Sequence, residues 1–96
     1  MDFLKFNEDV KPFLEGYSIE YLMFQNGDFG DLARVEVIGP TKVATVDFWS
    51  RGWVGVDIYD CRCDEQVMNI LISPDEKSLL PQVFEEFINK MKFISE

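Results

Sequence analysis

Four short segments between residues 32 and 72 alternate apolar and polar side chains, and this pattern constrains the fold more than any other feature of the sequence. A period of two is typical of a β-strand with one buried face. The turns between the segments are too short for the helical crossovers that parallel strands need, so the pattern predicts an antiparallel meander. The four predicted strands are residues 32–38, 42–49, 53–59 and 66–72.

The segment before these strands predicts a helix followed by an extended stretch. Residues 2–15 carry apolar side chains at helical spacing, and Pro12 predicts a break near the end of this helix. Residues 17–24 are rich in aromatic and branched side chains but alternate only loosely. They predict an edge strand or an extended segment.

The segment after the strands has the signals of a capped helix. Ser73 can cap it, Pro74 suits its first position, and Glu76 completes a capping box. Pro81 interrupts the early turns, so the main helix is predicted to start at that residue. A broad apolar stripe follows with a helical period and is predicted to pack in the core. The stripe consists of Leu80, Val83, Phe84, Phe87, Ile88, Met91 and Ile94.

Alternation divides the predicted sheet into two different faces. The apolar face, on which the helices are expected to pack, comprises Val35, Val37, Val46, Phe48, Val54, Val56, Ile58, Met68, Ile70 and Ile72. The polar face comprises Arg34, Glu36, Thr45, Asp47, Trp49, Trp53, Asp57, Tyr59 and Asn69. The 96 residues are thus predicted to form a single α+β domain, residues 1–96, in which an antiparallel β-meander of four or more strands has N-terminal and C-terminal helices packed on one face.

The polar face is unusual because it mixes large aromatic side chains with carboxylates. Trp49 and Trp53 flank a tight turn, so they could pack on each other or be covered by residues 17–31. Alternatively they anchor a protein partner, because Trp, Tyr and Arg contribute most to the energetics of interfaces. The surrounding carboxylates would then pair with Lys and Arg of a basic partner.

The net charge of the chain also favours a basic protein partner. Eighteen Asp and Glu stand against nine Lys and Arg, which gives a formal net charge of −9. Nucleic acid and anionic membranes are disfavoured as partners because both bind positive surfaces. A cationic partner is favoured, although an acidic surface can also serve solubility alone. No stretch reads as a transmembrane helix or a secretory signal, so we expect a cytoplasmic protein.

The residues that most enzymes and metal sites use are scarce. The sequence has no His, which removes the usual general base and a common metal ligand. Cys61 and Cys63 form a C-x-C pair, and two thiols alone do not complete a zinc site, so we expect reduced cysteines in a turn. Asp28 and Asp31 do not have the spacing of a calcium-binding loop. We therefore expect no enzyme, no metal site and no cofactor.

The middle of the chain resembles the small acidic immunity proteins of bacterial polymorphic toxins, particularly those of contact-dependent growth inhibition systems. The resemblance covers roughly half of the sequence. It rests on the DFW-S-x-GW hairpin of residues 47–53, the DIYD of residues 57–60 and the NILISPDE junction of residues 69–76. It implies a protein that binds and neutralises a cognate toxin C-terminal domain, often a nuclease, in the cytoplasm of the cell that makes it. Such proteins have no catalysis of their own.

The resemblance also suggests where the toxin domain would bind. Toxin nucleases tend to be basic, and an acidic blocker can occupy their substrate groove. The contact set expected on this basis is Asp28, Asp31, Glu36, Asp47, Trp49, Trp53, Asp57, Tyr59 and Asp60. If binding occurs away from the toxin's active site, Glu8, Asp9 and Glu15 of the N-terminal helix are the alternative contacts.

Other functions stay open at this point. An acidic adaptor, or a nucleic-acid mimic acting on a host protein, would share the acidic surface but have a different partner. A small enzyme that pairs Asp57 with Asp60 is disfavoured, because residues three apart in a strand point to opposite faces. An uncovered aromatic face could also pair with a second copy, giving a homo-oligomer when the protein is free.

Overall fold

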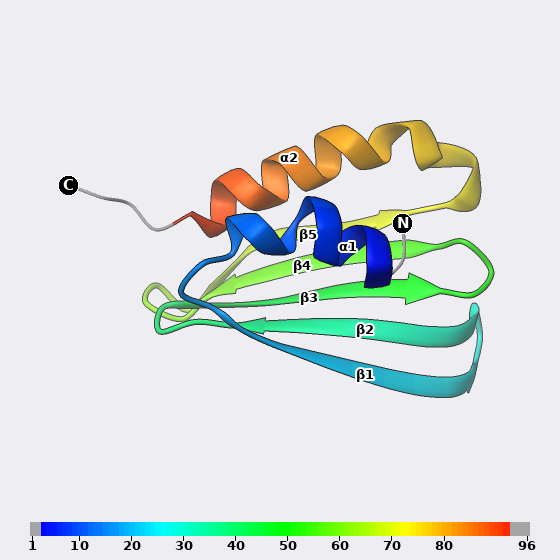
Figure 1. The fold of residues 1–96 in the computed structure, drawn as a ribbon, viewed down its shortest axis with the longest axis horizontal. Helices are drawn as coiled ribbons and strands as arrows, with labels where there is room; N and C mark the ends of the chain where they lie inside the picture. Colours follow the sequence, from blue (N-terminus) through cyan, green and yellow to red (C-terminus); the bar gives the residue numbers. More distant parts are fainter. Residues whose placement is uncertain (1–2, 93–96) are drawn as a thin grey trace.

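The computed structural model describes residues 3–92 as one antiparallel sheet with helices on one face (Figure 1). Its five strands lie in the order β1-β2-β3-β4-β5, so strands that follow one another in sequence are neighbours in space. The predicted α+β meander with a helix at each end is therefore confirmed. The elements are α1 (Phe3–Asp9), the 3₁₀ turn η1 (Lys11–Phe13), β1 (Ser18–Gly27), β2 (Gly30–Ile38), β3 (Lys42–Trp49), β4 (Val54–Asp60), β5 (Glu65–Ile72), the 3₁₀ segment η2 (Pro74–Leu79) and α2 (Leu80–Met91).

The N-terminal predictions hold in outline. The helix ends earlier than expected, because α1 stops at Asp9 and Pro12 lies within the short turn η1 that follows. The stretch predicted as an edge strand or an extended segment is the edge strand β1, which is longer than expected. The first residue of the predicted helix, residue 2, lies outside the described residues.

The C-terminal predictions are also close. Ser73 and Glu76 form the expected capping box, in which the backbone N–H of Ser73 donates to the Glu76 carboxylate at 3.0 Å. The main helix begins at Leu80, one residue before the predicted start at Pro81. Ile94 of the predicted stripe lies outside the described residues, and the other six members of the stripe pack in or against the core.

The core lies between the sheet and the helices. Every residue of the predicted apolar face is buried except Ile70, which is partly buried and packs against the same core. From α1, the rings of Phe3 and Phe6 contact Phe48 of β3 edge to face. The C-terminal end of α2 is attached to the sheet side by the Lys42 ammonium, which donates to the Lys90 carbonyl at 2.6 Å. Among the helices of residues 3–92, none combines the length and the apolar composition that crossing a bilayer requires.

Candidate protein-binding site

The sheet face opposite the helices is the candidate site, and we call it the open face. Within the described residues, both helices lie on the other side of the sheet (Figure 1). Directly paired residues in antiparallel strands share a face, so the strand registers assign the open face row by row. One row consists of Glu20, Glu36, Thr45, Asp57 and Asn69. The next row consists of Leu22, Arg34, Asp47, Gly55 and Leu71.

Arg34 and Asp47 form a bidentate ion pair at the centre of the second row. The guanidinium donates through Nε to Oδ1 at 2.7 Å and through Nη2 to Oδ2 at 3.1 Å. The hydrogen bond to Asp47 raises the pKa of Arg34. The same guanidinium lies 5.5 Å from the ring centre of Phe24, in cation–π contact. Asp47 is therefore on the predicted face, but its charge is already paired within the protein.

Three aromatic rings form a cluster at one end of the open face. Phe29 stacks on Trp53 with the ring centres 4.7 Å apart, and it meets Trp49 edge to face at 5.6 Å. Trp49 also lies over Gly55, where an added Cβ would stand 3.2 Å from the indole ring. Both Trp side chains are half-buried. From the predicted cover, residues 17–31, Phe29 contacts both Trp rings.

Two turns are bonded together beside this aromatic cluster. The N–H of Ser50 donates to the Asp31 carbonyl at 2.8 Å, and the N–H of Asp31 donates to Ser50 Oγ at 2.9 Å. Gly30 makes this approach possible, because its φ is +94° and a Cβ there would stand 2.1 Å from Ser50 Oγ. The exposed side chains of Asp28 and Asp31 are thereby held at the same end of the sheet as the aromatic cluster.

The other predicted contacts on the open face lie farther along β2 and β4. Glu36 and Asp57 occupy the same row, two strands apart, and both side chains are half-buried. Asp57 accepts a hydrogen bond from the Gln66 side chain at 2.6 Å. Tyr59 lies on the same face, opposite Val43 of β3. These residues extend the acidic and aromatic surface away from the aromatic cluster.

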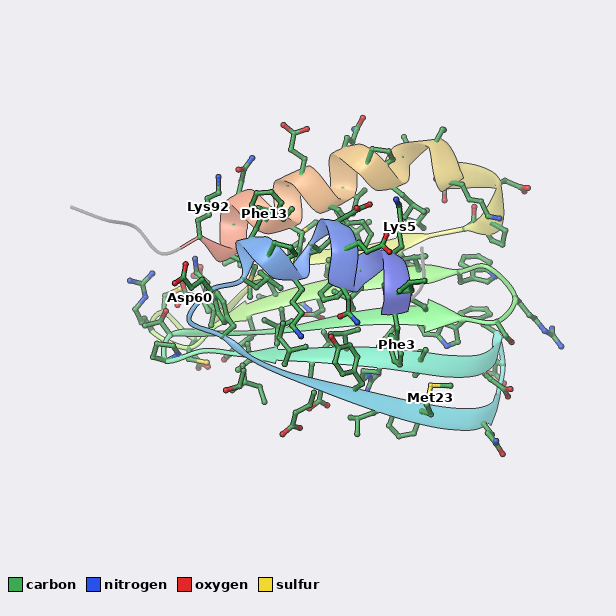
Figure 2. The ribbon with its side chains drawn as sticks, in the orientation of Figure 1. Phe3, Lys5, Phe13, Met23, Asp60 and Lys92 are labelled. Atoms are coloured by element: carbon green, nitrogen blue, oxygen red, sulfur yellow. The ribbon has the colours of Figure 1, made fainter. Side chains whose placement is uncertain are left out.

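Asp60 does not belong to this surface. It shares the side of β4 that carries Ile58, and it is only 7% exposed at the end of the sheet (Figure 2). Its carboxylate accepts hydrogen bonds from the Arg62 backbone N–H at 2.9 Å and from the Arg62 guanidinium. These bonds lower the pKa of Asp60. Of the predicted contact set, Asp60 thus lies on the opposite face from Asp57, and the two carboxylates do not converge.

Several residues of the open face were not expected from the sequence. Glu20 lies directly opposite Glu36, and neither carboxylate has an ion-pair partner among the described residues. Phe24 and Leu71 are 46% and 49% exposed, so apolar surface reaches both edges of the sheet. Once β1 is paired with β2, its alternation alone places Glu20 and Phe24 on this face. Phe29 lies in a turn, where alternation gives no signal.

The alternative contacts on the N-terminal helix lie on the other side of the molecule. Asp9 is ion-paired with Lys5 at 3.1 Å, and both line a groove of about 590 Å³ between the N-terminal helical segment and α2. Figure 2 shows Lys5, Phe13 and Lys92 around this groove. Three of the nine basic residues of the chain line it, namely Lys5, Lys77 and Lys92. This groove is therefore a poorer match to a cationic partner than the open face.

The described residues contain no cluster of three or more Cys, Asp or Glu side chains suited to a metal ion. Cys61 and Cys63 are free and exposed in the β4–β5 turn. No family model matches the chain, and comparison with curated proteins and with solved structures likewise found no match. The residues of the open face are therefore the features that bear on function.

Proposed function

We propose that this protein is an immunity protein that neutralises a toxin domain by binding it through the open face, with no catalysis of its own. The observation that carries the proposal is the combination, on one uncovered face, of half-buried aromatic rings with the carboxylates of Glu20 and Glu36, which have no ion-pair partner among the described residues. Large exposed patches that combine apolar and polar groups are typical of protein-binding surfaces. The resemblance of the central sequence to immunity proteins supports the same function.

The chemistry of the face suggests how binding would work. Glu20, Glu36, Asp28 in the β1–β2 turn and Asp31 at the start of β2 would pair with Lys and Arg of a basic toxin surface. The aromatic cluster would supply the apolar contacts that exclude water around those pairs. A net charge of −9 would steer a cationic domain toward the protein and speed association. A nuclease domain is a suitable target, because its substrate groove must be positive to bind phosphates. The expected place of action is the cytoplasm of the producing cell.

The test is co-expression with the toxin domain encoded by the adjacent upstream gene, followed by purification of the complex. We expect a one-to-one complex that restores growth and an association rate that falls as salt concentration rises. The double variant Glu36→Lys/Asp57→Lys should lose binding. The matched control Glu8→Lys/Glu15→Lys makes the same change in net charge on the helix side and should retain it.

Two outcomes would contradict the proposal. If the toxin domain remains toxic and does not bind, the protein acts on another partner, as an acidic adaptor or a nucleic-acid mimic would. If the control variant loses binding while the open-face variant keeps it, the contact lies on the helix side. Circular dichroism of both variants establishes that any loss of binding is not a loss of folding.

A further inference from the structure

The outer edge of β1 is the second surface of interest. β1 is the longest strand of the sheet, with ten residues, and within the described sheet it pairs with β2 alone. Its outer backbone groups therefore have no strand beside them. Such an edge can bind another strand through main-chain hydrogen bonds.

The side chains of β1 are apolar on both faces of the sheet. Tyr21 and Met23 lie on the helix side, where they are 38% and 67% exposed, and Met23 is labelled in Figure 2. Leu22 and Phe24 lie on the open face. Apolar residues on both faces are typical of strands that are covered on both sides. β1 therefore carries more apolar surface than an exposed edge position requires.

β1 has few of the features that prevent natural edge strands from pairing with another chain. Edges are usually blocked by Lys, by Pro, by inward-pointing charges or by a central bulge. Glu20 is the only charged residue of β1, the strand contains no Pro, and its irregularity lies at the end, between Phe24 and Gly27. The opposite edge strand, β5, has α2 running alongside it (Figure 1). The two edges of the sheet are thus not equivalent.

We propose that β1 pairs antiparallel with β1 of a second copy, which joins two sheets into one of ten strands. A two-fold axis at Leu22 keeps the side-chain alternation in phase, because it pairs Tyr21 with the partner's Met23 on one face. The same axis places Glu20 opposite the partner's Phe24, so the two Glu20 charges do not meet. The pairing uses only the β1 margin of the open face, so Glu36, Asp57 and the aromatic cluster of each copy stay accessible to another partner.

The area that this contact buries indicates how stable the dimer is. With about 200 Å² for each large side chain, the exposed fractions of Tyr21, Met23 and Phe24 leave about 300 Å² per copy. Two copies bury about 600 Å² of these side chains plus the paired backbones, below the roughly 1,200 Å² of a stable interface. The net charge of −9 on each copy opposes association, and salt screens it. The dimer is therefore weak, and salt strengthens it.

Sedimentation equilibrium of the reduced protein, from micromolar to millimolar concentration, tests this inference. The mass should rise from 11.2 kDa toward twice that value, at lower concentration when salt is added. Leu22→Lys and Met23→Lys should remain monomeric. Leu71→Lys, an exposed position on the opposite edge strand, should dimerise like the unaltered chain. The inference is overturned if the unaltered chain stays monomeric throughout, or if Leu71→Lys abolishes the dimer.

Hydrogen exchange of the unaltered chain provides a test that needs no variant. The outward amides of β1 should exchange several-fold more slowly at millimolar than at micromolar concentration, while β5 amides should not change. Equal exchange of β1 at both concentrations would show that this edge stays free. Salt should weaken toxin binding and strengthen dimerisation. The two experiments can therefore succeed or fail separately, and the failure of one proposal leaves the other standing.

Discussion

Arg34 of β2 and Asp47 of β3 face each other directly across the sheet and form a bidentate ion pair on the open face, with the closer bond at 2.7 Å. The pair is partly buried, and the Phe24 ring covers the guanidinium on one side. A pair of this geometry is stronger than an ordinary surface salt bridge, because both hydrogen bonds are aligned and partly shielded from water. Asp47 therefore has a structural role on the open face, whereas Glu20 and Glu36 have no ion-pair partner among the described residues.

Removal of either partner of this pair should destabilise the protein. We expect Asp47→Ala and Arg34→Ala each to lower the free energy of unfolding by about 1–2 kcal/mol, because each leaves a partly buried charge without its partner. The double variant should cost less than the sum, with a coupling energy of about 1 kcal/mol in urea unfolding. Strictly additive losses would show that the pair contributes nothing. Asp47 is accordingly a poor site for testing partner binding, since its substitution affects folding.

The opposed carboxylates of Glu20 and Glu36 predict a conflict between stability and binding. Like charges directly across two strands are destabilising, so Glu20→Lys should raise the free energy of unfolding by about 0.5 kcal/mol. The same variant should bind a cationic partner more weakly. Glu15→Lys makes an equal change in net charge away from the sheet, so it separates the local effect from the global one. The prediction would be contradicted if the free energy of unfolding of Glu20→Lys were no higher than that of Glu15→Lys.

Phe29 is predicted to hold the two Trp side chains in place. Phe29→Ala removes a ring that stacks on Trp53 and meets Trp49, so it should increase acrylamide quenching of Trp fluorescence. Because Phe29 is half-buried, the loss in unfolding free energy should be about 1–2 kcal/mol, less than for a core Phe. Phe24→Ala is the matched control, since that ring covers Arg34. Equal quenching in both variants would mean that Phe29 does not shield the Trp side chains.

Much of the fold could be predicted from the sequence because its strands alternate strictly. The strand at residues 42–49 was predicted with its observed bounds, and both of its faces were assigned correctly. β4 was predicted one residue early, because Trp53 continues the alternation but lies before the strand. The length and pairing of β1 could not be predicted, since apolar residues on both of its faces mask any period of two.

The candidate site was less predictable, for reasons that differ between residues. Trp49 and Asp57 were placed on the open face because they occur within regular strands. Phe29 joined the site through contacts between two turns, which no local pattern reports. Asp60 was assigned to the contact set although alternation puts it on the same side as Ile58.

The carboxylate of Asp60 predicts how acid affects stability. Its bonds to Arg62 hold its pKa below the ordinary value of 3.8, so folding favours the ionised form. A lowered pKa stabilises the folded state fully above the ordinary value, and this contribution is lost as pH falls through the folded-state pKa. The difference in unfolding free energy between the unaltered protein and Asp60→Asn should therefore be greatest near neutral pH and shrink on acidification below about pH 4. Asp64→Asn, in the same turn, is the control, because Asn tolerates the positive φ of 56° at that residue. A difference that is constant from neutral to acidic pH would mean that Asp60 acts through packing and not through its charge.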